Sequence, residues 1–277
     1  MKKSCYFNHT KAFMKKIFIV HCSLFIVHCL LTGCDIIKPE DRFIPITGRI
    51  MSEKRVLLVE FTDQNCKNCL YATAEIERLT ERFSDTIVVV SIHSNPLPFP
   101  LRTSEGNEYE QHFKAEDHPA GIVDGGTGKY MSHDPQAWGG FILERLKEEP
   151  ALMIDMAVYA DSADNETTVS VYIEGIKALS DIKLQLWIIE NNIEQWQLML
   201  DGTRNDNYLH NHVFRSSING TWGESFSIEA AEKKEFIYHF TLQPAWKQED
   251  MTIVCFVYYP DTDEIINVQQ ISLLTKI

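Results

Sequence analysis

Two cysteines separated by two residues give the strongest chemical signal in the sequence, in the segment Cys66, Lys67, Asn68, Cys69. Because they follow a predicted strand and open a predicted helix, their side chains should lie close enough to form a disulfide. The amino end of a helix carries a partial positive charge that favours the thiolate of Cys66, and Lys67 adds a further positive charge. Since the thiolate is the reactive form, we expect Cys66 to attack and Cys69 to resolve the mixed disulfide.

Three other interpretations of the cysteine pair compete with this one. A purely structural disulfide is disfavoured, because closing so short a loop stabilises a fold by only about 2 kcal/mol. A zinc site needs two more ligands, and these would have to come from residues such as His93, His118 or His133. An unreactive pair on a scaffold that is used for binding stays open as an alternative.

The elements around the pair alternate between strand and helix over residues 49–150. Short apolar runs predict buried strands, and apolar residues spaced three or four apart predict helices. The order of these elements predicts an α/β domain that ends at Pro150. We expect strands at Arg55–Phe61, Thr86–Ile92, Pro119–Asp124 and Lys129–Ser132, and helices at Cys66–Phe83, Ser104–Lys114 and from Pro135 towards Pro150, the last with Asp134 as its N-cap.

The sequence after Pro150 changes character, because strand-like segments and turn signals replace the helical patterns. About seven short strands without a convincing helix predict an antiparallel β-sandwich of the immunoglobulin-like type over residues 151–277. The predicted fold class is therefore α/β plus all-β, in two domains. The expected strands are Met153–Ala160, Thr167–Glu174, Lys183–Glu190, Gln195–Leu200, Glu235–Leu242, Met251–Tyr259 and Ile265–Leu273.

The N-terminus has the pattern of a secretory signal peptide. Lys15 and Lys16 precede an apolar run, Ile17–Leu31, that is too short to span a bilayer. We therefore interpret residues 1–33 as a signal peptide. Met14, directly before the two lysines, is a better candidate for the true start than the first methionine of the sequence.

The segment Leu31-Thr32-Gly33-Cys34 resembles the bacterial lipobox. In a lipobox the cysteine is lipidated and becomes the first residue of the mature protein. The resemblance implies that Cys34 is lipidated and that residues 34–48, which lack periodicity, form a tether. An ordinary signal peptide with a cysteine nearby is the alternative.

The charge balance excludes several classes of partner. The chain of 277 residues carries 26 Lys+Arg against 39 Asp+Glu, a formal net charge of −13. Binding to nucleic acid or to anionic lipid headgroups requires clustered cationic side chains, so we expect neither. Contact with the membrane is expected through a lipid anchor only.

The order of elements around Cys66 and Cys69 is similar to that of thioredoxin. In that family a buried acid ahead of the pair shuttles protons for the resolving cysteine, and the resemblance places Glu60 in this role. Burial on an apolar strand would raise the pKa of Glu60 as the role requires, whereas a glutamate on an edge strand would face water. The resemblance also implies that Pro119 is the loop proline that is cis in thioredoxins and packs against the active sulfurs.

Further segments resemble the Bacteroidetes outer membrane protein 28-related lipoproteins. They are Val59–Thr62, His118–Gly121, Tyr208–Arg215 and Gly220–Gly223, in addition to the lipobox. In that family a thioredoxin-like domain precedes a β-sandwich, and the members are assigned to the outer membrane. The resemblance covers nearly all of the predicted mature chain, so it implies an outer-membrane lipoprotein of the cell envelope.

Two histidines and a third cysteine, outside the cysteine pair, are also of types that could bind a metal or react. His210 and His212 would point the same way on a strand and could bind a metal, although a solvated or loop-ordering role is favoured. Cys255 lies in an apolar alternating segment and is expected to be a buried thiol without a chemical role.

These observations lead to one leading hypothesis and one main alternative. The leading hypothesis is a lipid-anchored envelope protein that exchanges disulfides with the thiols or disulfides of other envelope proteins, using Cys66, Cys69, Glu60 and Pro119. The alternative is a surface lipoprotein for binding or adhesion, which uses the same fold as a scaffold. Neither hypothesis calls for a cofactor or a metal.

Overall fold

The computed structural model describes residues 53–126, 128–161 and 166–273, which belong to one compact unit, Pro45–Ile277. The predicted signal peptide, the whole predicted tether and the predicted lipidation site Cys34 lie outside the described residues. Among the described helices, none is long and apolar enough to cross a membrane.

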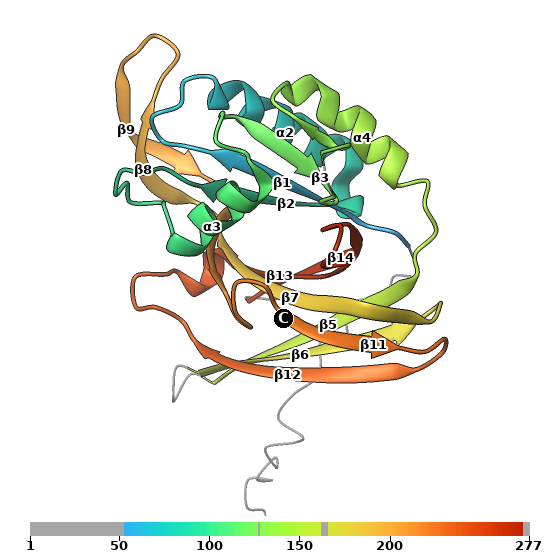
Figure 1. The fold of residues 1–277 in the computed structure, drawn as a ribbon. Coiled ribbons are helices and arrows are strands. Elements are labelled where there is room, and N and C mark those ends of the chain that lie inside the picture. The colour runs from blue at the N-terminus through green and yellow to red at the C-terminus, as the bar shows by residue number, and fades with distance from the viewer. Residues whose placement is uncertain (1–52, 127, 162–165, 274–277) are drawn as a thin grey trace, which may run out of the picture. The chain divides into compact units, whose positions relative to one another are not determined.

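The first half of the described chain has the predicted order of strands and helices (Figure 1). Strand β1 pairs in parallel with β2 and in antiparallel with β3, and β3 pairs with β4. Helices α2 and α4 pack on one face of these strands. The elements are β1 (Val56–Thr62), α2 (Cys69–Phe83), β2 (Ile87–His93), α3 (Ser104–Phe113), β3 (Ala120–Val123), β4 (Met131–Ser132) and α4 (Trp138–Arg145), with short 3₁₀ helices at Ser84–Thr86 and Pro135–Ala137.

Two predicted helix boundaries are wrong. Helix α2 begins at Cys69 rather than at Cys66, because the backbone between the two cysteines forms a turn first. The last helix begins as the 3₁₀ helix and continues as α4, which ends at Arg145 rather than near Pro150. Its predicted N-cap is confirmed, since the Asp134 side chain accepts a hydrogen bond from the backbone N–H two residues ahead.

The second half of the described chain is made of strands. The seven predicted segments are confirmed as strands, but three further strands, β9, β10 and β11, were not predicted. The strands are β5 (Leu152–Asp161), β6 (Glu166–Gly175), β7 (Leu179–Glu190), β8 (Ile193–Leu198), β9 (Arg204–His210), β10 (Val213–Ser217), β11 (Glu224–Ile228), β12 (Lys233–Thr241), β13 (Met251–Tyr258) and β14 (Ile265–Ser272), with a 3₁₀ helix at Gln248–Asp250.

One sheet contains strands from both halves. Its order is β14-β13-β7-β10-β2-β1-β3-β4, and β11 also pairs with β7. The connection is β10, which pairs in antiparallel with β7 and in parallel with β2, where Val213 lies opposite Ser91. A second sheet, β12-β6-β5, and the hairpin β8-β9 complete the strands. The fold is thus mixed α/β plus β, and a domain boundary at Pro150 stays a prediction.

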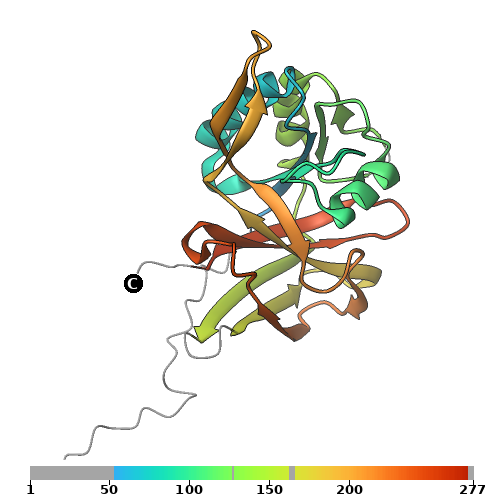
Figure 2. The same cartoon turned by 90° about the vertical axis from the view of Figure 1, so that its left-hand side faces the viewer.

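The side chains of β1 alternate between two cores. Val56 and Leu58 face α2 and α4, whereas Val59 and Phe61 face an aromatic core built with β7, β10 and β13. Because of the same alternation, Glu60 lies on the side of α2. A third core lies between β7 and β13 on one side and β5, β6 and β12 on the other, as the layers in Figures 1 and 2 show.

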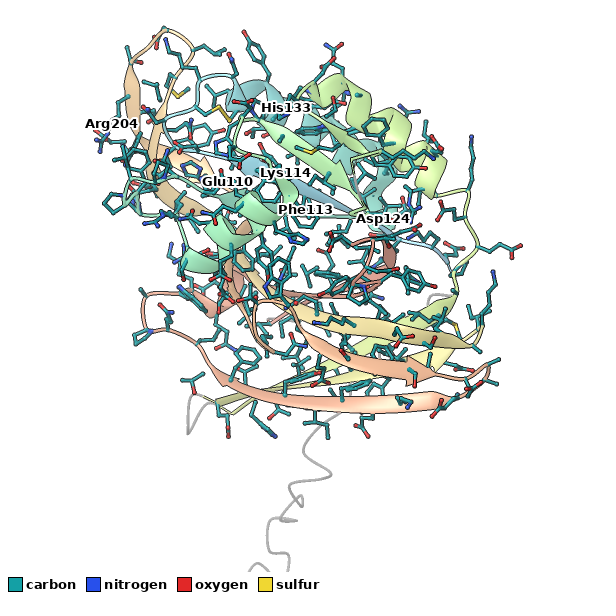
Figure 3. The ribbon with its side chains drawn as sticks, viewed as in Figure 1. Glu110, Phe113, Lys114, Asp124, His133 and Arg204 are labelled. Atoms are coloured by element: carbon teal, nitrogen blue, oxygen red, sulfur yellow. A yellow bond between two sulfur atoms is a disulfide. The ribbon has the colours of Figure 1, made fainter. Side chains whose placement is uncertain are left out.

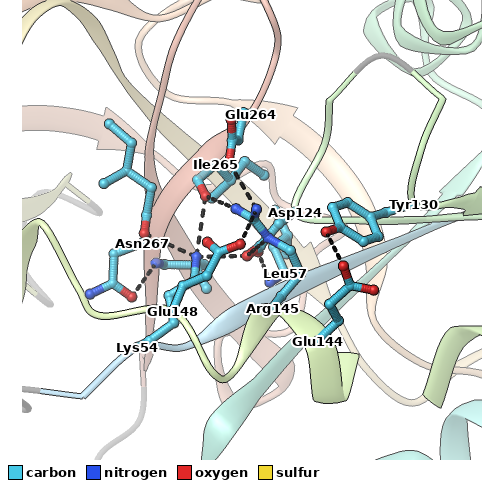
Figure 4. A network of polar contacts seen from close by, with 12 residues as sticks. Lys54, Leu57, Asp124, Tyr130, Glu144, Arg145, Glu148, Glu264, Ile265 and Asn267 are labelled. Atoms are coloured by element: carbon cyan, nitrogen blue, oxygen red, sulfur yellow. Dashed lines mark hydrogen bonds and ion pairs between the residues drawn. The ribbon is translucent and has the colours of Figure 1, made fainter. Parts of the chain in front are cut away.

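A buried charge network joins the start of β1, the end of β3, helix α4 and strand β14 (Figure 4). The Asp124 carboxylate lies 2.6 Å from Lys54 Nζ and 3.1 Å from Arg145 Nε, and it accepts a hydrogen bond from the Leu57 N–H. Lys54 and Arg145 also donate to the carbonyl oxygen of Ile265. All three charged side chains are almost fully buried, so each depends on the others for compensation.

Candidate functional site

Cys66 and Cys69 form a disulfide, with their Cα atoms 5.4 Å apart. The two residues differ in exposure, because Cys66 is partly exposed whereas Cys69 is 3% exposed and packs in the interior. The predicted division of roles, in which an accessible sulfur attacks and a buried sulfur resolves, requires such a difference and stays a prediction.

The turn before helix α2 positions the Cys66 sulfur. The backbone N–H of Cys66 donates to the Asp63 carbonyl, and the Asp63 carboxylate accepts from the Asn65 N–H. The N–H of Cys69, the first residue of the helix, donates to Cys66 Sγ at 3.1 Å. The N-cap residue Asn68 makes no side-chain cap, so the sulfur itself accepts at the positive end of the helix. A thiolate at this position would be stabilised.

A polar groove of about 540 Å³ lies at Cys66 and contains His118, the residue before Pro119. The peptide bond between His118 and Pro119 is cis, and Pro119 is buried. Glu110 on α3, labelled in Figure 3, holds His118 through a contact of 2.7 Å and also accepts a hydrogen bond from Ser94. The groove is lined by Asp63, Asn65, Cys66, Lys67, Asn68, Asn95 and His118.

Glu60 lies in the centre of the sheet, since β1 is flanked by β2 and β3, and it is only 3% exposed. The alternative of an edge-strand glutamate facing water is therefore wrong. Ser91 on β2 donates a hydrogen bond to Glu60 Oε2 at 2.7 Å. Burial nevertheless raises the pKa of Glu60 to about 7, because desolvation of the charged form outweighs the hydrogen bonds with Ser91 and Thr62.

A small cavity of about 60 Å³ brings Glu60 and Cys69 together. Strands β1 and β2 place Glu60 and Ser91 in its inner wall, and the first turn of α2 places Cys69 beside them. The buried residues Glu60 and Cys69 therefore both line one polar cavity, whereas the partly exposed residue Cys66 lines the groove.

The hairpin β8-β9 contributes residues that the sequence did not assign to the site. It extends from the β-rich half to the side of α2 in both views (Figures 1 and 2). Gln197 on β8 donates to the carbonyl oxygen of Cys66 at 3.1 Å, and the N–H of Leu198 donates to the carbonyl of Gln64. On its outer side Arg204, labelled in Figure 3, lies over the ring of Trp196. The sequence predicted β8 as a strand at Gln195–Leu200, but neither that pattern nor the resemblance over Tyr208–Arg215 implied a position beside the cysteines.

The histidines expected on one strand occupy different environments. His210 ends β9 and is buried, with its ring 5.2 Å from that of His93, whereas His212 lies in the turn that follows, with a positive φ of 57°. A solvated role is therefore wrong for His210. Burial lowers the pKa of both His210 and His212 to about 4.

The described residues contain no group of three or more His, Cys, Asp or Glu side chains that could hold a metal ion. Cys255 is fully buried on β13, as predicted, and burial raises the pKa of its thiol.

The pKa of Glu60 leads to a prediction about stability. A carboxyl whose pKa is higher in the folded state than in the unfolded state stabilises the fold at low pH and loses this contribution as pH rises. Relative to Glu60→Gln, the wild type should lose about 3 kcal/mol of unfolding free energy between pH 4.5 and pH 8. Urea unfolding of both proteins over this range measures the difference, and the histidine contributions cancel in it. A constant difference would show that Glu60 titrates normally.

Comparison with known proteins gives one family and several similar structures. The model of the family described as outer membrane protein Omp28 matches residues 106–276. The structure is similar to HBP35 of Porphyromonas gingivalis, with 19% identity, a TM-score of 0.68 and coverage of 83% of this chain and 80% of that one. No curated protein matches the sequence.

Two further solved structures are also similar to this chain. A protein from Agrobacterium tumefaciens has 13% identity and a TM-score of 0.50, with coverage of 82% of this chain and 98% of that one. A domain of the outer membrane lipoprotein Omp28 from Porphyromonas gingivalis has 22% identity and a TM-score of 0.32, with coverage of 45% of this chain and 89% of that one. At these identities, the likeness to HBP35 and to the Agrobacterium protein concerns the fold alone.

Proposed function

The chain belongs to the Omp28 family of outer membrane proteins, and on that premise we propose that it exchanges disulfides with other envelope proteins through Cys66 and Cys69. Both the family and the location at the outer membrane of the cell envelope were predicted from the sequence, and both are confirmed. The observation that carries the proposal is the asymmetry of the pair. One sulfur is partly exposed at the amino end of a helix, and the other is buried in a cavity with a carboxyl of raised pKa.

The order of elements supports the finer classification of the fold. Strand β1, helix α2 and strand β2 form a parallel β-α-β unit, and β3 returns in antiparallel after a cis proline. We propose that residues 49–150 are thioredoxin-like on these grounds. The core between β7 and β13 and the sheet β12-β6-β5 supports a β-sandwich of the immunoglobulin-like type over residues 151–277.

In the proposed reaction Cys66 acts first. Its thiolate attacks one sulfur of a substrate disulfide, and the leaving thiolate of the substrate carries away the electron pair of the broken bond. The Cys69 N–H at the helix start and the nearby ammonium of Lys67 favour the thiolate form of Cys66. The groove with His118 would hold the polypeptide that carries the disulfide.

Cys69 and Glu60 act second. Glu60 accepts the proton of the Cys69 thiol, and the resulting thiolate attacks Cys66 Sγ of the mixed disulfide. The second substrate thiolate leaves, and the Cys66–Cys69 disulfide seen in the structure is the product. A base with a pKa of about 7 is suited to this transfer at neutral pH.

The N-terminal segment suggests how the protein is attached to the membrane. We propose that Cys34 carries the lipid and that residues 34–48 link it to the folded part, so that the membrane is contacted through the lipid only. The partners in this proposal are thiols or disulfides of proteins in the same compartment. The net charge of −13 supports the proposal that nucleic acid is not among the partners.

One observation favours the second candidate, a binding lipoprotein with a structural disulfide. The hairpin β8-β9 is bonded to the segment around the cysteines, through Gln197 to Cys66 and through Leu198 to Gln64. Such contacts would also hold an inert loop in place. The two candidates differ in whether the disulfide can be opened and closed by small thiols and disulfides under mild conditions.

The experiment that separates them uses the reduced protein and the aromatic disulfide 5,5′-dithiobis(2-nitrobenzoate). Attack by Cys66 releases one coloured thiolate, and resolution by Cys69 releases a second one. We expect two kinetic phases of equal amplitude in native protein, followed by recovery of the Cys66–Cys69 disulfide. If thiolate is released only after the protein is unfolded, the pair is structural and the exchange function is wrong.

A further inference from the structure

The cavity behind Cys69 is separate from the groove at Cys66. None of the described residues lines both, since the groove is formed by the turn before α2 and by His118, and the cavity by β1, β2, α2, β8 and β9. The cavity wall changes from buried to exposed along its length. Glu60 and His93 are buried at its inner end, whereas Glu77, Leu209 and Asn211 are exposed at its rim. It therefore reaches solvent between α2 and β9, away from the groove.

Thr62 is close to the Glu60 carboxyl, and the backbone of Gln195 and Trp196 is close to the His210 ring. Three buried polar atoms of residues that line this cavity nevertheless make no hydrogen bond of normal geometry among the described residues. They are Glu60 Oε1, His93 Nδ1 and His210 Nε2. Leaving such an atom unpaired costs about 1–3 kcal/mol. A polar cavity needs a volume of about 10–15 Å³ and several polar partners to hold one water molecule. This cavity has a volume of about 60 Å³, which is enough for more than one water molecule.

We propose that this cavity is the proton exit of the resolution step, in which water held by Glu60, His93 and His210 carries the proton of Glu60 to solvent at the rim. The proposal rests on the exchange function described above. His93 and His210 are positioning residues in it, because they orient the water and do not touch the reacting sulfurs. A substrate bound in the groove at Cys66 would leave this path open.

The electrostatics of the cavity suit such a path. Burial lowers the pKa of His93 well below its usual value, and the neighbouring His210, His118 and Arg215 add to the effect. Burial likewise lowers the pKa of His210. Both rings are therefore neutral at pH 7, and a neutral imidazole has one donor and one acceptor nitrogen, so it can extend a chain of hydrogen bonds in either direction.

Other titratable groups face the cavity from the elements packed around it. Helix α2 provides Cys69 and Glu77, strand β9 provides Tyr208, and the following turn provides His212. Burial raises the pKa of Tyr208 and lowers that of His212. Exposed Glu77 provides a carboxylate at the rim, which favours the outward movement of a proton.

The step is balanced in atoms and electrons. The proton leaves Cys69 for Glu60 and then passes through water to solvent, while the Cys69 thiolate forms the bond to Cys66 Sγ. The bond between Cys66 and the substrate sulfur breaks, and the substrate thiolate keeps its electron pair. The substrate disulfide is the oxidant, and the protein dithiol is oxidised.

The test compares wild type with His93→Leu and His210→Leu in the two-phase reaction with 5,5′-dithiobis(2-nitrobenzoate). We expect the first phase to be unchanged and the second phase to be about tenfold slower at pH 7 in each variant. His93→Asn, which can still bind water, should recover part of the rate. His239→Leu, at an exposed position of β12, is the matched control and should behave as wild type.

A second readout keeps this test independent of the exchange function. Carboxyl ¹³C NMR of the oxidised protein reports the titration of Glu60, and loss of the water contacts should move its midpoint to higher pH in both leucine variants. Absence of a first phase in wild type contradicts the exchange function, whereas an unchanged Glu60 midpoint in folded His93→Leu and His210→Leu overturns the proton path. An unchanged second phase in both variants overturns it as well.

Discussion

Cys66→Ala is expected to release no thiolate from 5,5′-dithiobis(2-nitrobenzoate), whereas Cys69→Ala should release one equivalent and then stop. The reason is the difference in exposure, since the Cys66 sulfur is accessible at the groove and Cys69 is buried behind it. In Cys66→Ala the Cys69 thiol is 3% exposed and borders only a cavity of about 60 Å³, which is too small to admit the reagent. In Cys69→Ala the mixed disulfide on Cys66 has no resolving partner and accumulates.

The matched control for this pair of variants is Cys255→Ala. Cys255 is fully buried on β13, and burial raises the pKa of its thiol, so its removal should leave both phases intact. Mass spectrometry of Cys69→Ala should find the aryl group on Cys66. Equal behaviour of Cys66→Ala and Cys69→Ala would contradict the assigned order of the two sulfurs.

Asp124→Asn is expected to destabilise the fold by about 3 kcal/mol or more, because it breaks a buried charge network. The variant keeps a side chain that can accept from the Leu57 N–H, but it leaves Lys54 and Arg145 buried without their shared counter-charge. Asparagine is chosen because Asp124 has a positive φ of 52°, which asparagine tolerates better than alanine.

The control is Glu264→Gln, which removes the charge of another Arg145 partner whose side chain is 45% exposed. A salt bridge that is open to solvent contributes little, so we expect a loss of about 1 kcal/mol or less. Urea unfolding at pH 7 measures both variants. Equal losses of unfolding free energy in Asp124→Asn and Glu264→Gln would show that burial does not determine how much the charge network stabilises the fold.

The strands and helices near the cysteine pair could be predicted because local patterns determine them. The buried strands β1 and β2 are continuous apolar runs, and α2 has apolar residues at helical spacing. The start of α2 was misplaced by one turn because the same residues can form either a first helical turn or the turn that now holds Cys66 Sγ against the Cys69 N–H.

The hairpin and the cavity could not be predicted, since both depend on contacts between distant parts of the chain. Strand β9 has the sequence RNDNYLH, in which polar and turn-forming residues hide the strand pattern, and most of it is exposed. Nothing local indicates that β10 joins the sheet beside β2, which brings His210 next to His93. The burial of Glu60 was one of two open alternatives, and only the neighbours of β1 decide between them.

The redox potential of the Cys66–Cys69 couple tests the central claim most directly. The protein is equilibrated in defined mixtures of reduced and oxidised glutathione or dithiothreitol, and the dithiol fraction is measured after alkylation. An exchange-competent pair should have a potential in the range of about −120 to −270 mV, as for known dithiol catalysts. A potential below about −300 mV, with reduction only after unfolding, would identify a structural bridge and contradict the exchange function.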